Sequence, residues 1–219
     1  MEQIEKSVRQ RIVVLGANGG IGRQVVLQAL AAGHQVTAIL RSPEKLAIAD
    51  QHLEIVKGDV MNPGSLTEHF MQKDTLISAI GRNSFKRTTL YSQGSKNVIY
   101  AMQESGLKRA FFISASGIEV NPTHSLLIRL ATRFILQAML RNMYADQVVM
   151  ESLIKSSFID WTIIRPPKLL NKPKTGNYRV SLNTFLDNGI SISRADVAHF
   201  IVSNLINKAI VRKTVEIAY

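Results

Sequence analysis

Short apolar runs alternate with longer segments of helical periodicity along almost the whole chain. The runs are rich in β-branched residues and bounded by turn-forming residues, a pattern typical of buried strands. They predict strands at residues 11–15, 35–40, 53–57, 75–80, 109–114, 161–165 and 214–218. The periodic segments between them predict helices near residues 22–32, 64–72, 92–105, 145–156 and 194–207. This alternation indicates an α/β fold in which helices cover both faces of a parallel sheet.

A glycine-rich turn follows the first of these strands. Glycines stand at 16, 19 and 22, between the apolar run 11–15 and a helix-type pattern. Gly16 permits a tight turn, Gly19 lets a phosphate approach the backbone, and Gly22 lets the helix pack close to the strand. The free N–H groups of that helix would then face an anion. The motif predicts a doubly wound, Rossmann-type single domain over residues 1–219 that binds a dinucleotide. A purely structural strand-to-helix turn is the alternative.

The residue that ends the second strand distinguishes two nicotinamide dinucleotides. An NAD site usually carries Asp or Glu there to accept from the ribose 2′-hydroxyl, whereas this chain has Arg41. An arginine cannot accept a hydrogen bond, but its planar fork binds a 2′-phosphate. Lys45 and Arg23 are further candidates for the same anion. We therefore expect NADP(H), and a solvated charge at the strand end is the alternative reading of Arg41.

The carboxyl ends of the later strands complete the expected site, because ligands of open α/β sheets bind at those ends. Asp59 could accept from the adenine amino group or cap the next turn, and Pro166 with Pro167 would form a rigid wall against a nicotinamide ring. The expected cofactor-binding residues are Gly16, Asn18, Gly19, Gly20, Ile21, Gly22, Arg23, Arg41, Lys45, Asp59, Val60, Ala79, Ile80, Gly81, Arg82, Ser114, Pro166 and Pro167.

Hydroxyl groups near the fifth strand are the candidates for catalysis. Ser114 and Ser116 could reach a nicotinamide or a substrate carbonyl, or could simply cap their loop. Tyr144 opens a later helix and is the third candidate. Near the C-terminus, the segment 192–198 reads as a structural helix start with Ser193 as its N-cap and Asp196 in its first turn.

The segment from Val120 to Ala145 contains no acidic residue. Arg129, Arg133, Gln137 and Arg141 recur every four residues, so a helix near 125–141 would carry them as one polar stripe. Its other positions are mostly apolar, namely Leu126, Leu127, Leu130, Phe134, Ile135, Met139 and Leu140. Such a helix could roof the active site, pack in an oligomer or lie on an anionic membrane, and a buried cover helix is the simplest reading. The substrate side would come from residues 115–145 and 167–195.

Composition excludes several classes of function. The chain of 219 residues has no cysteine, which removes disulfides and thiolate chemistry, and its five histidines lack metal-ligand spacing, so we expect no metal. The net charge of +11 suits an anionic small molecule, and no nucleic-acid motif accompanies it. No signal-peptide pattern or spanning helix is apparent, so we expect a cytoplasmic protein.

Several motifs spread over the chain after Gln10 belong to one combination: Gly16–Gly22, Leu40–Arg41, Gly58–Val60, Gly81–Asn83, Ser92–Gly94, Arg165–Pro167, Thr175–Tyr178 and Ser193–Phe200. This combination resembles the atypical short-chain dehydrogenase/reductase family of the NAD(P)-binding, NmrA-like kind, and within it the flavin reductases, or biliverdin reductases B. The resemblance implies Arg41 at the 2′-phosphate, Asp59 and Val60 at the adenine, Gly81 and Arg82 near the pyrophosphate and ribose, and Pro166 and Pro167 at the nicotinamide. It also implies hydride transfer to flavins or open tetrapyrroles in a shallow pocket that depends little on an enzyme acid.

The chain departs from the family pattern at the residues that would move protons. The usual Tyr-x-x-x-Lys pair is broken, because Val148 stands four residues after Tyr144. Glu151 stands where the flavin reductases have a histidine. Two hypotheses follow. The chain is an NADPH-dependent reductase of a flat conjugated small molecule (a flavin, quinone or tetrapyrrole), or it is a non-catalytic NADP(H) sensor or scaffold with a protein partner.

Overall fold

The computed structural model describes residues 9–81 and 86–219. These residues contain ten strands and seven α-helices. The strands are β1 (Arg11–Leu15), β2 (Gln35–Leu40), β3 (Leu53–Lys57), β4 (Thr75–Ser78), β5 (Arg109–Ile113), β6 (Asp160–Arg165), β7 (Lys168–Leu170), β8 (Arg179–Leu182), β9 (Ser191–Ser193) and β10 (Lys213–Ala218). The α-helices are α1 (Gly20–Ala31), α2 (Thr67–Phe70), α3 (Leu90–Ser105), α4 (Leu126–Ala131), α5 (Gln137–Met139), α6 (Arg141–Lys155) and α7 (Arg194–Ser203). A π-helical turn, Thr132–Leu136, joins α4 to α5.

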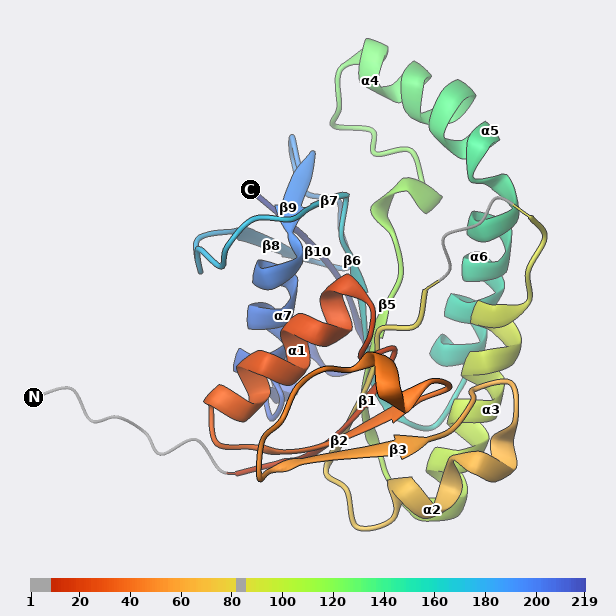
Figure 1. The fold of residues 1–219 in the computed structure, drawn as a ribbon. Coiled ribbons are helices and arrows are strands. Elements are labelled where there is room, and N and C mark those ends of the chain that lie inside the picture. The colour runs from red at the N-terminus through yellow and green to blue at the C-terminus, as the bar shows by residue number, and fades with distance from the viewer. Residues whose placement is uncertain (1–8, 82–85) are drawn as a thin grey trace, which may run out of the picture.

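Eight strands form one sheet in the order β3-β2-β1-β4-β5-β6-β10-β8 (Figure 1). The central strand β1 pairs in parallel with β2, Ile12 opposite Val36, and with β4, Ile12 opposite Thr75. Neighbouring strands are parallel except at one edge, where β8 runs antiparallel to β10. The chain winds outward from β1 in both directions, so the strand order reverses between β1 and β4. The prediction of a doubly wound α/β sheet is confirmed.

Helices cover both faces of this sheet, and β1 supplies both cores. Ile12 and Val14 join the core shared with α1 and α7, whereas Val13 and Leu15 join the core shared with α2, α3 and α6. Figure 1 shows α1 beside α7 on one side of the sheet and α3 beside α6 on the other. The four residues of β1 after Arg11 are all buried, which explains why this part of the strand is continuously apolar rather than alternating.

The structure differs from the sequence prediction mainly in its last third and in the basic helix. Strands β7, β8 and β9 were not predicted, and β7 pairs with β9 in a separate two-stranded sheet. The single helix predicted near 125–141 is interrupted by the π-helical turn and ends at Met139, and α6 begins at Arg141. We call residues 126–139 the roof segment. No residue of it is fully buried, so the reading as a buried cover helix is wrong.

Candidate dinucleotide site

The loop between β1 and α1 requires glycine for steric reasons. Gly16 has φ +77°, and a Cβ there would lie 2.4 Å from the carbonyl oxygen of Ala79 at the end of β4. A Cβ on Gly22 would lie 2.3 Å from the carbonyl oxygen of Gly16, and one on Gly19 would lie 3.1 Å from the same atom. The Gly19 N–H donates to the Gly16 carbonyl at 2.8 Å, which closes the turn. The loop is therefore a tight cradle in front of the helix N-terminus, as a pyrophosphate site requires.

A cleft of about 1160 Å³ runs from this loop along the carboxyl ends of the central strands. The sequence-predicted residues on its lining are Gly16, Asn18, Gly19, Gly20, Ile21, Arg41, Lys45, Asp59, Val60, Ala79, Ile80, Gly81, Ser114, Ser116, Tyr144, Pro166 and Pro167. Gly22 lies beneath the loop and acts through close packing. Arg23 is exposed on α1 and is not part of the lining, so its role stays a prediction. Arg82 lies outside the described residues.

The end of the cleft beside β2, where we expect the adenosine, is basic. Arg41 directly follows β2, Lys45 lies in the short 3₁₀ helix Pro43–Lys45, and both side chains are exposed. The Asn18 side chain donates to the Ser42 carbonyl at 3.4 Å, which ties the glycine loop to the arginine loop. On the opposite side, the Asp59 carboxylate accepts from the Met61 N–H at 3.0 Å. Asp59 thus caps the turn after β3, one of the two roles left open for it, while it also lines the cleft.

Two loops meet at the other end of the cleft, where a nicotinamide would lie. The Ser114 N–H donates to the Ile164 carbonyl at 2.8 Å, and the Ser116 N–H donates to the Pro166 carbonyl at 3.1 Å. These bonds hold the serine loop after β5 beside the paired prolines after β6. Pro166 is buried and Pro167 is half-buried. The rigid wall expected from the two prolines is therefore attached to the loop that carries the candidate hydroxyl groups.

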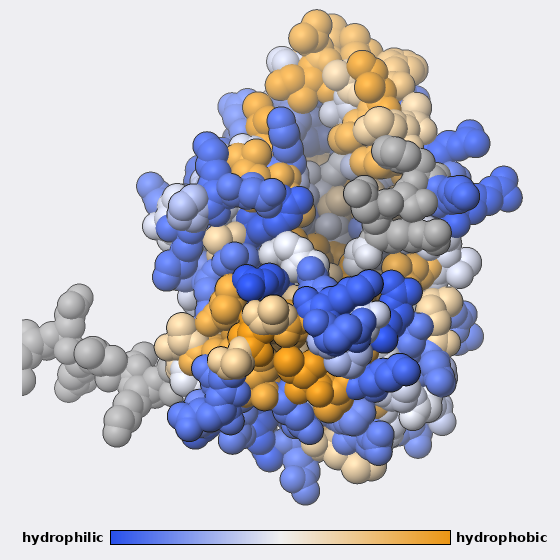
Figure 2. Space-filling view, viewed as in Figure 1, coloured by the Kyte–Doolittle hydropathy of each residue, from blue (hydrophilic) through white to orange (hydrophobic). Residues whose placement is uncertain are grey.

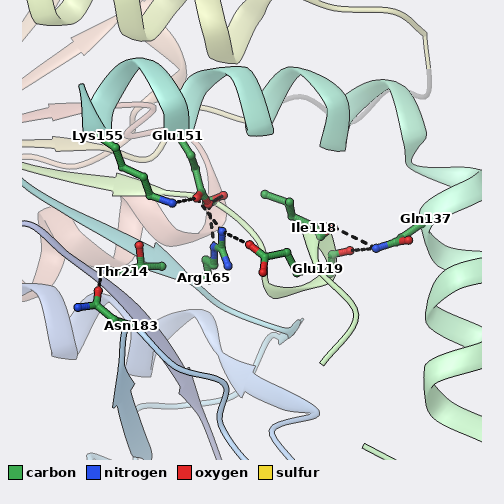
Figure 3. A network of polar contacts seen from close by, with 10 residues as sticks. Ile118, Glu119, Gln137, Glu151, Lys155, Arg165, Asn183 and Thr214 are labelled. Atoms are coloured by element: carbon green, nitrogen blue, oxygen red, sulfur yellow. Dashed lines mark hydrogen bonds and ion pairs between the residues drawn. The ribbon is translucent and has the colours of Figure 1, made fainter. Parts of the chain in front are cut away.

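An ionic network centred on the buried pair Glu151 and Arg165 lies next to Ser114. Figure 3 shows this pair together with Lys155 and Glu119. The Ser114 hydroxyl donates to the Glu151 carboxylate at 2.7 Å. Arg165 binds the same carboxylate through Nε at 2.8 Å and Nη2 at 2.7 Å, and Nη2 also reaches Glu119 at 2.8 Å. Lys155 donates to Glu151 at 2.8 Å. Sequence reasoning identified Glu151 only as a departure from the family pattern, and its pairing with Arg165 was not predicted.

This network keeps Glu151 ionised. Burial acts to raise the pKa of Glu151, but the hydrogen bonds and charge of Arg165, together with hydrogen bonds from Lys155 and Ser114, lower the pKa overall. Burial acts to lower the pKa of Arg165, and its pairing with Glu151 and Glu119 raises it instead. A carboxylate with three donors on it is a poor proton donor. The Ser114 hydroxyl proton is directed at Glu151, so Ser114 can accept a hydrogen bond from a ligand but is not free to donate one.

Tyr144 is the remaining predicted catalytic residue. Its hydroxyl approaches Gly117 so closely that a Cβ there would lie 2.4 Å from it. Burial raises the pKa of Tyr144, so the phenol stays protonated at neutral pH. The position one helical turn later, where the family has a lysine, is occupied by Val148, which is half exposed. Tyr144 can donate a hydrogen bond into the cleft, but it lacks the cation that would make it a base.

The roof segment closes the cleft over this end. Ile128, Thr132 and Leu136 are half-buried and line the cleft. Gln137 donates to the carbonyl oxygens of Gly117 and Ile118, both at 3.1 Å, which anchors the segment to the serine loop (Figure 3). Gln137 therefore points toward the protein, while Arg129 and Arg133 are exposed. The predicted single polar stripe is wrong, because the π-helical turn shifts the helical phase between Arg129 and Gln137.

Among the cleft residues that were not predicted from the sequence, Arg194 and Gln147 carry polar groups suited to a ligand. Arg194, the first residue of α7, lies across the start of α1, and a Cβ on Gly20 would lie 2.3 Å from its Cδ. Its guanidinium donates to Asn171 at 2.7 Å and to the Leu169 carbonyl at 3.3 Å. Gln147 on α6 is 4% exposed and lines the cleft, and its Oε1 has no hydrogen-bond partner within the described residues. Arg194 and Gln147 reach the cleft only through tertiary packing. The sequence offered a hint for Arg194 alone, because it lies in the family motif Ser193–Phe200.

The predicted start of the last helix is confirmed, and its Asp196 also makes hydrogen bonds that were not predicted. Ser193 is the N-cap, accepting from the Asp196 N–H at 2.9 Å. The Asp196 carboxylate in turn accepts from the N–H groups of Thr175 and Gly176, each at 2.8 Å, and from the Tyr219 hydroxyl at 2.6 Å. One carboxylate thereby joins the 175–177 loop, the start of α7 and the C-terminal residue.

Comparisons with known proteins agree with this geometry. A family model described as NAD(P)H-binding matches residues 16–208. An uncharacterized chloroplastic protein of Arabidopsis thaliana is 32% identical over 234 residues, which covers 98% of this chain and 79% of that protein. Isoflavone reductase homolog A622 of Nicotiana tabacum is 25% identical over 219 residues, covering 95% of this chain and 68% of that protein. Reductase names thus occur among the relatives.

A solved structure shares the fold. The short-chain dehydrogenase/reductase (wide type) from Veillonella parvula DSM 2008, in complex with NADP, has a TM-score of 0.79 and 15% identity, covering 97% of this chain and 95% of that one. The narrower resemblance to flavin reductases stays a prediction. Because the matching model begins at Gly16 and extends over most of the sheet, the chain belongs to the NAD(P)H-binding family of Rossmann-type α/β proteins.

Proposed function

We propose that this chain is an NADPH-dependent reductase that passes a hydride to a flat conjugated acceptor such as a flavin, a quinone or an open tetrapyrrole. The observation that carries the proposal is the continuity of the cleft. It joins the glycine loop to a space enclosed by Ser116, Pro167 and Tyr144 and by apolar residues of the roof segment. A binding site for the nucleotide alone would not need this additional space.

The basic end of the cleft supports NADPH rather than NADH. Arg41 stands where an acidic residue would accept from a ribose 2′-hydroxyl, and Lys45 lines the same end. Both are cations suited to a 2′-phosphate. Arg194 lies over the first turn of α1, where its charge adds to the N–H groups that face a pyrophosphate.

The residues at the far end position an acceptor more than they protonate it. The bound nicotinamide cofactor supplies the hydride. Pro166 and Pro167 provide a rigid surface for its ring, and Tyr144 offers a phenolic O–H to a carbonyl of the acceptor. Glu151 is held ionised by Arg165, so it does not supply a proton. An acceptor that takes its proton from water fits this arrangement, and conjugated acceptors of the flavin or quinone kind do so.

Steady-state oxidation of NADPH tests the proposal. The purified chain is assayed with FMN, riboflavin and a set of quinones, and each rate is compared with the rate for NADH. We expect turnover with at least one acceptor and a clear preference for NADPH. Absence of turnover with every acceptor, under conditions in which calorimetry shows bound NADPH, would contradict the reductase assignment.

A second function is favoured by the same polar groups. This function is a non-catalytic NADP(H) sensor or scaffold with a protein partner. It is supported by the Ser114 hydroxyl, which already donates to Glu151, and by the raised pKa of Tyr144. The absence of a lysine four residues after Tyr144 supports it as well. A redox sensor must bind one form of the cofactor more tightly than the other. Titration with NADP⁺ and with NADPH decides this, because equal affinities would leave no basis for a redox switch.

A further inference from the structure

The outward face of the roof segment carries six of the exposed large apolar side chains of the described residues. Its side chains protrude from the molecule: Leu127 is 81% exposed, Ile135 67% and Phe134 66%. Leu126, Leu130 and Met139 are also exposed large apolar residues. Figure 2 shows apolar side chains gathered over the top of the molecule, where Figure 1 places α4 and α5. Isolated exposed apolar residues are ordinary, but a contiguous set on one protruding segment marks an interaction surface.

This surface carries positive charge and no negative charge. Arg129 and Arg133 are exposed between the apolar side chains, and Arg141 is exposed two residues beyond the end of the segment. No Asp or Glu occurs from Val120 to Ala145. Long arginine side chains can extend beside apolar neighbours to reach phosphate groups while those neighbours enter an acyl region.

We propose that the roof segment docks the protein on the surface of an anionic lipid bilayer. The exposed leucine, isoleucine and phenylalanine side chains enter the interface, and the arginines bind lipid phosphates. The opposite face of the segment stays on the protein, where Ile128, Thr132 and Leu136 line the cleft. No helix within the described part of the chain is long and apolar enough to cross a membrane. The contact that we propose is interfacial. It does not depend on the proposed reductase activity.

Charge distinguishes a bilayer from a second copy of the chain. In a two-fold dimer the same patch meets itself, so Arg129 and Arg133 of one copy would face those of the other. The segment offers no acidic residue to pair with them. An anionic membrane supplies the missing negative charge, and the net charge of +11 strengthens the attraction.

Vesicle flotation with the full chain tests the proposal. Vesicles of phosphatidylglycerol mixed with phosphatidylcholine are compared with vesicles of phosphatidylcholine alone. We expect the chain to float with the anionic vesicles and its partitioning to fall about tenfold or more on the neutral ones. The double variant Leu127→Ser/Phe134→Ser should lower binding to anionic vesicles by about tenfold or more, because it removes two large apolar side chains from the interface. Neither residue lines the cleft, so cofactor binding should not change.

Matched controls separate this surface from general effects. The variant Phe158→Ser/Ile206→Ser removes two equally exposed apolar side chains elsewhere, 84% and 61% exposed, and should bind vesicles as the unmodified chain does. Arg129→Glu/Arg133→Glu should abolish binding, whereas Lys96→Glu/Lys108→Glu, with the same change in net charge, should retain most of it. The proposal is overturned if the chain stays in the lipid-free fraction or if the control variants lose binding equally. It is also overturned if sedimentation without lipid shows a dimer that Leu127→Ser/Phe134→Ser dissociates.

Discussion

At the scale of a single residue, we predict that Arg41 selects the cofactor. It follows β2, lines the cleft and is exposed, so its guanidinium can turn toward a 2′-phosphate without disturbing the core. We predict that Arg41→Asp weakens NADPH binding by about ten- to a hundredfold, because a charge-assisted hydrogen bond to phosphate is replaced by repulsion. Binding of NADH should change little. Isothermal titration calorimetry with both cofactors measures the difference.

Arg23 provides the comparison for this variant. Both arginines were sequence candidates for the same phosphate, but only Arg41 lines the cleft. Arg23→Asp should therefore leave the affinity for NADPH within about twofold, since a single exposed charge off the site is largely screened. Equal losses for the two variants would show that the phosphate lies closer to α1 than the geometry indicates.

We predict a role in acceptor specificity for Gln147, a residue that only the structure brings to the cleft. A buried amide oxygen without a partner is costly, and such groups often meet a ligand. We predict that Gln147→Leu raises KM for the acceptor by about tenfold while the affinity for NADPH stays the same, because the acceptor loses a hydrogen bond from its own N–H or O–H. The free energy of unfolding should be equal or higher. A lower stability with unchanged KM would make Gln147 a structural residue instead.

At the scale of the element, Asp196 holds the start of α7 in place. Burial acts to raise the pKa of Asp196, but hydrogen bonds from Tyr219, Gly176 and Thr175 outweigh it and lower the pKa to about 2. We predict that Asp196→Asn costs about 2 to 4 kcal/mol of stability at pH 7, because an amide presents its own donors to the donors that surround it. Urea unfolding measures the change, and Asp187→Asn, on an exposed carboxylate, is the matched control.

The pH dependence of this effect has a defined sign. A carboxylate whose folded-state pKa lies below its unfolded value of 3.8 stabilises the fold at every pH above that value. The contribution, about 2 kcal/mol for this shift, is lost as the pH falls from about 4 to about 2. The difference in stability between the unmodified chain and Asp196→Asn should therefore be constant above about pH 5 and shrink below it. A difference that does not depend on pH would contradict the ionised network.

The buried central strands could be predicted from the sequence, whereas an edge strand and the π-helical turn could not. The central strands are apolar on both faces, so β1, β2 and β5 were visible as runs without reference to their neighbours. Strand β8 is mostly exposed, and it exists because Val180 and Leu182 pair with β10 across an edge. Its pattern therefore has no strong period. The π-helical turn was not predictable either, since no Pro or Gly marks it, and it reversed the expected orientation of Gln137.

The candidate site divides in a similar way. The glycine loop and Arg41 were predicted because their function depends on local geometry, a positive φ at Gly16 and a position just after β2. Arg194 and Gln147 reach the cleft only through the packing of α7 against α1 and of α6 against α3. Residues that act through neighbours distant in sequence have no local pattern, so the cofactor half of the site was more predictable than the acceptor half.

At the scale of the whole molecule, the excess of positive charge should accelerate binding of an anionic cofactor. The chain has 27 Lys and Arg residues against 16 Asp and Glu, and Arg41, Lys45 and Arg194 concentrate positive charge at the nucleotide end of the cleft. A field of this sign attracts NADPH over distances longer than a hydrogen bond, and salt screens it. We predict that raising the ionic strength from about 20 mM to about 500 mM slows NADPH association about tenfold, as measured by stopped-flow fluorescence.

Reduced nicotinamide mononucleotide is the control ligand, because it carries the same ring with fewer phosphate charges. Its association rate should fall by a smaller factor over the same range of salt, since steering scales with the charge of the ligand. Arg41→Asp should lower the salt dependence for NADPH as well as its affinity, because it removes positive charge at the mouth of the cleft. Identical salt dependences for the two ligands would mean that the net charge does not steer the cofactor. The proposed contact of the roof segment with an anionic bilayer would then remain as a role for the basic surface. The flotation assay tests that contact independently of the cofactor.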